Sequence, residues 1–307
     1  MKQNKILVIR GGAIGDFILT LPVFGALREM FPATRLEVLG YPHIARLAVT
    51  GGLCEDMRSI DARPLASFFA RNGKLDADLS AYFSSFAIII SYLYDPDQIF
   101  QNNLRSITAS QLIHGPHRPS EQEDVHATEV FLKPLETLAI FGPDHLPRLD
   151  PQRFLANGTD YANYVCFHPG SGSERKNWPE AKWRDLALRV FAETKFNVVL
   201  VGGEAEGERL QRLAAALPAD RVKVLRNQPL NELAGVIGRC RAFAGHDSGI
   251  THLASALGLP CVVVWSDTKK AIWQPRHANC QVVDNPFGVT AVEVERVWAV
   301  LKSVLRT

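Results

Sequence analysis

Three glycine-rich segments of the chain are each followed by residues that can do acid–base or anion-binding chemistry. The first, VIRGGAIGDFILTLP from Val8 to Pro22, breaks an apolar run with glycines and then places Asp16 at the start of a helix. A dinucleotide fingerprint would need glycine where Arg10 stands, and a P-loop would need lysine where Asp16 stands. A carboxylate also repels a bound phosphate. Asp16 is therefore interpreted either as a helix cap or as a general base that faces a substrate.

The second segment, HPGSGSERKNWP from His168 to Pro179, has the composition of a diphosphate site. Its glycines, Gly172 among them, leave backbone N–H groups accessible, and Ser171 and Lys176 add a hydroxyl and a cation ahead of a helix. Together these groups can hold a diphosphate without a metal ion. The alternative is a flexible connector in which Lys176 is a solvated side chain.

The third segment, GHDSGITHLA, follows a short apolar run and opens a helix. A helix that starts here directs its first backbone N–H groups at any ligand above it. The alternatives are that Asp247 only caps the helix and that His252 only packs within it. No further ligand stands at a recognisable metal-site spacing, so we expect no metal. The candidate binding residues of this segment are Asp247, Ser248, Gly249 and His252.

Two further sets of charged residues allow either a binding role or a purely structural one. Glu204 follows an apolar run that ends in two glycines, where a carboxylate suits the two hydroxyls of a ribose. Otherwise Glu204 only interacts with the dipole of a following helix. Four cations beyond the second predicted strand form either an anion-binding acceptor surface or a solvated basic face: Arg58, Arg63, Arg71 and Lys74.

The elements around these segments follow a βαβ pattern twice. Residues 5–10 form a short apolar run, helical spacing of apolar residues follows as far as residue 31, and residues 36–40 form a second strand-like run. The pattern returns with strand-like runs at 164–167 and 197–201 around an amphipathic stretch at 180–194. Strand, helix and strand in this order imply parallel sheets. Between the two halves, residues 142–159 are rich in proline and glycine and have no period.

We therefore predict two Rossmann-like, doubly wound α/β domains, at residues 1–150 and 160–307, joined by a linker at about 142–159. Ligands of open α/β sheets bind at the carboxyl ends of the strands, so the loops of the two domains are expected to face each other across a cleft. A C-terminal helix that packs back on the N-terminal domain is compatible with this division.

Composition excludes several classes of protein. The 307 residues are 47% hydrophobic and 21% charged with a net charge of +2, which is ordinary for a globular protein and lacks the basic excess of a nucleic-acid binder. Five cysteines without a C-x-x-C pair argue against a disulfide scaffold or zinc site. No apolar run suits a membrane span or a signal peptide, so we expect a cytoplasmic protein, with attachment to the inner face of the plasma membrane left open.

In this order the three segments resemble glycosyltransferase family 9, the lipopolysaccharide heptosyltransferases. The first family signature is matched by Ile9-Arg10, Gly15-Asp16 and Leu21-Pro22. The second is matched by residues 168–172 with Lys176 and Trp178-Pro179, and the third in full from Asp247 to Ala254. Thr268 and Trp273-Gln274-Pro275 are similar to a later motif. The resemblance covers most of the chain, and the order of the motifs makes it specific.

This resemblance implies a GT-B fold and an inverting, metal-independent transfer of a sugar from an ADP-sugar, typically ADP-heptose, with no cofactor. It makes Asp16 the general base and adds Arg10 and Gly15 to the predicted acceptor residues Arg58 and Arg63. It places Glu204 at the ribose and residues 225–230 near the adenine. The implied partners are the nucleotide-sugar donor and a glycan or lipid-linked glycan acceptor. The implied donor-binding residues are Ser171, Gly172, Lys176, Glu204, Gln228, Asp247, Ser248, Gly249 and His252.

The chain departs from the family pattern at two places. Ser266-Asp267-Thr268 stands where the family often has Gly-Pro-Thr, and the segment from Ser91 to Asp97 differs from the usual acceptor region. These differences concern the donor sugar and the acceptor more than the reaction class. The alternatives are another nucleotide-sugar enzyme of the same build, such as an epimerase or a transferase with a different donor, and a non-catalytic nucleotide-sugar-binding protein.

Overall fold

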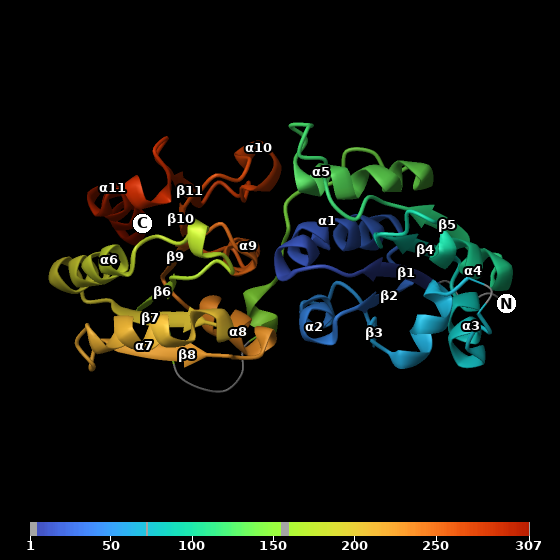
Figure 1. The fold of residues 1–307 in the computed structure, drawn as a ribbon, viewed down its shortest axis with the longest axis horizontal. Coiled ribbons are helices and arrows are strands. Elements are labelled where there is room, and N and C mark those ends of the chain that lie inside the picture. Colours follow the sequence, from blue (N-terminus) through green and yellow to red (C-terminus); the bar gives the residue numbers. More distant parts are fainter. Residues whose placement is uncertain (1–4, 72, 155–159, 307) are drawn as a thin grey trace. The chain divides into compact units, whose positions relative to one another are not determined.

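The computed structural model describes residues 5–71, 73–154 and 160–306, and the chain divides between Pro147 and Arg148 into two compact units (Figure 1). Each unit contains one parallel sheet with helical connections between its strands, so the prediction of two doubly wound α/β domains is confirmed. The division falls within residues 142–159, the predicted linker, of which 155–159 lie outside the described residues.

The N-terminal unit has a five-stranded parallel sheet in the order β3-β2-β1-β4-β5. Its strands are β1 (Lys5–Arg10), β2 (Arg35–Gly40), β3 (Asp56–Ser59), β4 (Ile88–Ser91) and β5 (Gln111–His114). Its α-helices are α1 (Ile14–Met30), α2 (Pro42–Thr50), α3 (Ala77–Ser84), α4 (Ile99–Ile107) and α5 (Ala127–Leu132). The described residues of this unit also form the 3₁₀ segments η1 (Arg63–Phe69) and η2 (Lys133–Leu138). Helices α1 and α5 lie side by side (Figure 1).

Strand β1 lies at the centre of this sheet and is buried because apolar side chains leave it on both faces. Leu7 and Ile9 point into one core cluster, in which they join Phe83 of α3 and Phe100 of α4. Phe83 and Phe100 meet edge to face, with 6.1 Å between ring centroids. This packing fixes the carboxyl end of β1, from which the first glycine-rich segment departs.

The C-terminal unit has a six-stranded parallel sheet in the order β11-β10-β9-β6-β7-β8. Its strands are β6 (Tyr164–His168), β7 (Asn197–Gly202), β8 (Val222–Arg226), β9 (Ala242–His246), β10 (Cys261–Val264) and β11 (Cys280–Val283). Its α-helices are α6 (Glu180–Glu193), α7 (Gly207–Ala215), α8 (Leu230–Ile237), α9 (Gly249–Ala256), α10 (Lys270–Trp273) and α11 (Val294–Arg306). Four 3₁₀ segments are η3 (Pro151–Phe154), η4 (Glu174–Lys176), η5 (Glu204–Glu206) and η6 (Val289–Ala291).

The C-terminal helix α11 packs against α6 and against strands β9, β10 and β11 of its own unit. Its apolar side chains Val297 and Leu301 are fully buried in the same cluster as Trp178 and Trp183. Trp178 and Trp183 meet edge to face at 5.3 Å, and the indole N–H of Trp178 donates to the carbonyl oxygen of Val292 at 2.9 Å. The segment that follows β6 is therefore anchored to the core at Trp178.

In both sheets the first strand of the unit lies inside the sheet, and the direction of winding reverses beside it. The reversal falls between β1 and β4 in the N-terminal unit and between β6 and β9 in the C-terminal unit. Ligands of doubly wound proteins bind at the carboxyl ends of the strands at such a reversal.

Within the described residues, no helix has the length and apolar character needed to cross a bilayer.

Candidate active site

A cavity of about 540 Å³ lies at the carboxyl ends of the strands in the N-terminal unit. Each of the five strands contributes a residue from the loop that follows it: Gly11 after β1, Tyr41 after β2, Asp61 after β3, Tyr94 after β4 and His117 after β5. Its remaining lining residues are Arg10, Gly12, Asp16, Ile60, Phe69, Tyr92, Leu93 and Arg118. The cavity therefore occupies the place where this fold binds ligands.

Asp16 is a lining residue of this cavity and also supports the start of α1. Its Oδ2 accepts a hydrogen bond from the backbone N–H of Ala13 at 3.2 Å, and its side chain is 27% exposed. Gly12 has φ +97°, and a Cβ there would lie 3.1 Å from Asp16 Oδ2. A side chain at position 12 would crowd the carboxylate, so glycine leaves it room. The helix-cap role of Asp16 thus leaves the carboxylate accessible in the cavity.

Arg10 is a buried cation beside this carboxylate. Its Nη1 donates to the carbonyl oxygen of His117 at 2.8 Å, and its Nη2 donates to the carbonyl oxygen of Asp16 at 3.2 Å. The guanidinium also lies over the ring of Phe131, 4.4 Å from the centroid. Burial lowers the pKa of Arg10, and the nearby Asp16 carboxylate opposes that shift. Arg10 is therefore committed to positioning Asp16 and the loop after β5.

The other predicted acceptor residues do not line the cavity. Gly15 lies in the first turn of α1. Arg58 is exposed on the edge strand β3, and its guanidinium stacks over the ring of Tyr82 at 3.9 Å. Arg63 is exposed at the start of η1. The expected basic acceptor surface is thus not part of this cavity.

In the C-terminal unit, three loops at the carboxyl edge of the sheet meet at Asp247. Lys176 Nζ lies 2.7 Å from Asp247 Oδ2, and the hydroxyl of Thr268 donates to the same oxygen at 2.6 Å. These residues follow β6, β9 and β10, respectively. The lysine and aspartate side chains are 21% and 10% exposed, so the ion pair is partly shielded from water. The structure thus brings together Lys176 and Asp247, two residues predicted to bind the nucleotide-sugar donor, and places Thr268 beside them.

Helix α9 begins at the reversal point of this sheet. Ser248 is its N-cap, and its hydroxyl accepts from the backbone N–H of Thr251 at 3.3 Å. The Ser248 Oγ also lies 3.4 Å from His168 Nδ1, across the gap between the ends of β9 and β6. Gly249 is the first residue of the helix, and His252 is buried one turn further on. The structure thus starts α9 at Gly249, and anion binding by its first N–H groups stays a prediction.

His246 holds the segment after β6 in place. The backbone N–H of Trp178 donates to His246 Nε2 at 2.7 Å, so the ring proton lies on Nδ1, 3.2 Å from the carbonyl oxygen of Gly170. Burial lowers the pKa of His246 to about 3 and that of His168 to about 4, and both rings are therefore neutral near pH 7. His246 is therefore a structural partner of the predicted diphosphate segment, and His168, the first residue of that segment, contacts Ser248.

Within that segment, Ser171 and Gly172 shape the backbone. The hydroxyl of Ser171 lies 2.8 Å from Asn177 Oδ1 and 2.9 Å from the carbonyl oxygen of Ser173. Gly172 has φ +73°, a conformation that favours glycine. The segment is therefore a folded turn, stabilised by its own side chains and by His246.

The two residues predicted to contact the nucleoside follow strands β7 and β8, at the carboxyl edge of the same sheet. Glu204 is exposed after β7, whereas Glu206 is buried and accepts from the backbone N–H of Gly203 at 2.8 Å. Gln228 is exposed after β8, and its side-chain amide donates to the carbonyl oxygen of Arg226 at 3.2 Å. Glu206, which accepts this hydrogen bond within the turn after β7, was not predicted from the sequence, although it lies only two residues beyond Glu204.

In the part of the chain that the structure describes, no three His, Cys, Asp or Glu side chains gather as a metal ion would require. The two sites offer the accessible carboxylate of Asp16 in the N-terminal unit and the Lys176 cation with the start of α9 in the C-terminal unit. A carboxylate can take a proton from a hydroxyl, and a cation with backbone N–H groups can bind a phosphate.

Comparison with known proteins agrees with these features. Residues 145–296 match glycosyltransferase family 9 (heptosyltransferase). Lipopolysaccharide heptosyltransferase 1 of Pseudomonas aeruginosa is 39% identical over 115 residues, which cover 37% of this chain and 32% of that protein. This match thus spans about a third of the length of the relative. Lipopolysaccharide heptosyltransferase 3 of Escherichia coli is 22% identical over 295 residues, which cover 86% of this chain and 84% of that protein.

The fold is that of solved heptosyltransferases. The E. coli heptosyltransferase WaaC, solved with ADP-2-deoxy-2-fluoro heptose, superposes with a TM-score of 0.76 at 20% identity over 97% of this chain and 99% of that chain. At this identity the likeness establishes the fold, two parallel-sheet α/β domains of GT-B type. The match over residues 145–296, together with this fold, confirms the resemblance to glycosyltransferase family 9 that was predicted from the sequence.

Proposed function

We propose that the chain is an inverting, metal-independent glycosyltransferase that moves a heptose from ADP-heptose to a hydroxyl of a lipopolysaccharide-core or related glycan acceptor. The observation that carries the proposal is the Asp16 carboxylate, which lines a cavity at the reversal point of the N-terminal sheet beside a buried arginine. The family match of residues 145–296 supports the reaction class. The ADP-heptose analogue in the related WaaC structure supports the donor.

In this proposal the C-terminal unit binds the donor. Lys176 and the N–H groups at the start of α9 compensate the negative charge of the diphosphate, and Ser248 adds a hydroxyl. Asp247 holds Lys176 in place and contacts the sugar side of the site together with Thr268. Glu204 binds the ribose and Gln228 lies near the adenine.

The N-terminal unit activates the acceptor. The Asp16 carboxylate takes the proton of an acceptor hydroxyl as that oxygen attacks the anomeric carbon of the heptose. The bond between the anomeric carbon and the diphosphate oxygen breaks on the opposite face, so the configuration inverts and ADP leaves with the bonding electrons. The charge that grows on ADP is stabilised by Lys176 and the start of α9. The proton on Asp16 then passes to water.

Two measurements on the full chain test this function. The first is the thermal stabilisation of the protein by ADP, UDP and GDP and by their sugars; we expect selective stabilisation by ADP and ADP-heptose, because a bound ligand raises apparent stability by mass action. The second is the release of ADP from ADP-heptose with and without glycan extracts. Stabilisation by UDP-sugars in place of ADP-sugars would overturn the donor assignment. Selective ADP binding without transfer to any extract would favour a non-catalytic binding protein.

A further inference from the structure

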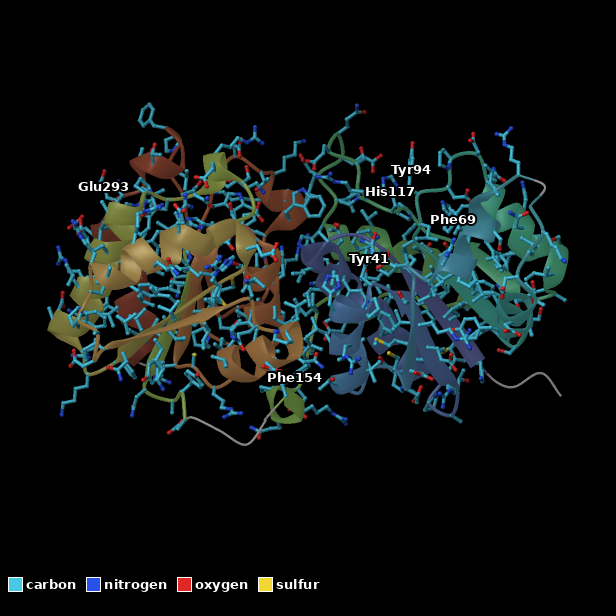
Figure 2. All side chains as sticks on the ribbon, turned by 60° about the horizontal axis from the view of Figure 1, so that its bottom comes forward. Tyr41, Phe69, Tyr94, His117, Phe154 and Glu293 are labelled. Atoms are coloured by element: carbon cyan, nitrogen blue, oxygen red, sulfur yellow. The ribbon has the colours of Figure 1, made fainter. Side chains whose placement is uncertain are left out.

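Aromatic side chains form a large part of the lining of the cavity around Asp16. Aromatic rings come from four separate loops: Tyr41 after β2, Phe69 at the end of η1, Tyr94 after β4 and His117 after β5 (Figure 2). Tyr94 is 68% exposed and Phe69 is 43% exposed, although large apolar side chains usually avoid water. Aromatic rings gathered from separate loops around one cavity indicate a ligand with an apolar face.

Tyr94 and His117 form the most exposed part of this aromatic lining. Their rings meet edge to face with 4.7 Å between centroids. Phe69, in contrast, is stacked on Phe100 at 4.9 Å, so one of its faces is already covered. Tyr94 and His117 therefore offer the larger accessible ring surface in the cavity.

The backbone beside both rings is held in place. Asp95 accepts from the backbone N–H groups of Phe100 and Gln101 at 3.2 and 3.0 Å, which fixes the residue next to Tyr94 to the start of α4. The carbonyl oxygen of His117 accepts from Arg10 Nη1 at 2.8 Å. This rigidity lowers the entropy that is lost when a ligand stacks on the pair.

The charges of the cavity balance one another. Among the described lining residues, the aspartates and arginines are Asp16, Asp61, Arg10 and Arg118, two negative and two positive. Arg10 is 2% exposed and already donates to two carbonyl oxygens. Arg118 lies 3.5 Å from Glu121 in an exposed ion pair. An anionic sugar would therefore meet no excess of positive charge, and it would approach the Asp16 carboxylate.

We propose that this cavity receives an uncharged pyranose ring of the acceptor, stacked on the Tyr94–His117 pair, so that the acceptor residue is a neutral sugar and not a sugar acid or a sugar phosphate. This inference rests on the proposed function. The C–H groups of a pyranose carry partial positive charge and pack on the negative face of an aromatic ring. Tyr41, Asp61 and Arg118 supply polar groups for the sugar hydroxyls, and Asp16 receives the proton of the reacting one.

The test uses saturation-transfer NMR and calorimetry on the full chain with matched probes: the methyl pyranosides of glucose, galactose and mannose, and their uronic acid and 6-phosphate counterparts. We expect the neutral probes to bind more tightly than the anionic ones. Tyr94→Ala should weaken neutral-sugar binding about ten-fold, and Tyr94→Phe should keep it, because the ring is retained. Phe141→Ala, which removes an aromatic side chain of similar exposure (71%) away from the cavity, should leave binding unchanged.

Tighter binding of the anionic probes, or no loss of neutral-sugar binding in Tyr94→Ala, would overturn the inference, as would the absence of binding by every neutral probe. Failure of the proposed function is separate. It is read from ADP and ADP-heptose, whose affinity should be the same in wild type, Tyr94→Ala and Phe141→Ala. Binding of neutral sugars without binding of ADP-heptose would support the proposed sugar subsite and would refute ADP-heptose as the donor.

Discussion

Arg10 and Asp16 form a pair with very different access to water: the guanidinium Nη2 lies 3.9 Å from the carboxylate Oδ1, and the side chains are 2% and 27% exposed. The arginine is held by two carbonyl oxygens and by the ring of Phe131, whereas the carboxylate lines the cavity. The buried arginine thus holds the carbonyl oxygens of Asp16 and His117 in place, while the Asp16 carboxylate stays accessible to a hydroxyl bound in the cavity.

The first prediction concerns Lys176, whose ammonium group pairs with Asp247 at 2.7 Å. Lys176→Ala should weaken ADP binding by roughly ten- to a hundred-fold, the range expected when a charge-assisted hydrogen bond to a phosphate is lost. Calorimetric titration with ADP measures it. Lys195→Ala, which removes an exposed lysine of the same unit, should leave the affinity unchanged. Equal ADP affinity in Lys176→Ala and wild type would remove Lys176 from the donor site.

The second prediction compares two helical glycines with different surroundings. Alanine is the better helix former at both positions. If Gly→Ala raises the free energy of unfolding at one position and lowers it at the other, the cause must therefore be the room available for the added Cβ. A Cβ at Gly235 in α8 would lie 2.3 Å from the carbonyl oxygen of Phe154, whereas a Cβ at Gly25 in α1 meets nothing within 4 Å. Gly235→Ala should destabilise its unit by about 1–3 kcal/mol, and Gly25→Ala should stabilise its unit by about 0.4–1 kcal/mol.

Urea unfolding checks this pair. All five tryptophans of the sequence lie in the C-terminal unit, so tryptophan fluorescence reports Gly235→Ala, and far-UV circular dichroism reports Gly25→Ala. A stabilising Gly235→Ala would show that α8 does not approach Phe154 as closely as the structure has it.

The third prediction is a pH dependence of stability in the C-terminal unit. His246 and His168 have pKa values lowered to about 3 and about 4, against a value near 6.5 in the unfolded chain. Below pH 6.5 the unfolded state binds protons that the folded state does not. The free energy of unfolding should therefore fall as the pH drops from 6.5 towards 4, by up to about 1.4 kcal/mol per pH unit for each histidine, and these two groups should contribute no slope above 6.5.

Urea titrations followed by tryptophan fluorescence between pH 5 and 8 measure this slope. His246→Gln keeps an acceptor for Trp178 N–H and a donor for the Gly170 carbonyl, and it should reduce the slope below pH 6.5. His43→Gln, at an exposed position in the N-terminal unit, is the control. A free energy of unfolding that stays constant from pH 8 to 5 would contradict burial of the neutral rings.

The central strands of the fold could be predicted from the sequence, because strands buried on both faces are continuous apolar runs. Strand β1 and strand β7 are of this kind. The edge strands of the N-terminal sheet could not be predicted in the same way. Strand β3 has the sequence DMRS and β5 has QLIH, both half-exposed and only four residues long, and such short polar runs carry no clear period.

The candidate site could be predicted in its residue types but not in its contacts. Lys176 and Asp247 are 71 residues apart, and only the pairing of β6 with β9 brings their loops together. The aromatic lining of the N-terminal cavity was not predicted at all, because its members stand singly in separate loops. Arg58 was predicted for the acceptor site by charge alone, and the structure places it against Tyr82, outside the cavity lining.

The most direct test of the account is the Asp16→Asn variant, assayed for ADP-heptose binding by calorimetry and for sugar transfer by single-turnover kinetics. Asparagine keeps a carbonyl oxygen that can accept from Ala13 N–H, so the start of α1 should be preserved. We predict unchanged donor affinity and a transfer rate lowered by about 10²- to 10⁴-fold, the range that general-base catalysis supplies. Transfer at the wild-type rate in this variant would contradict the assignment of Asp16 as the base.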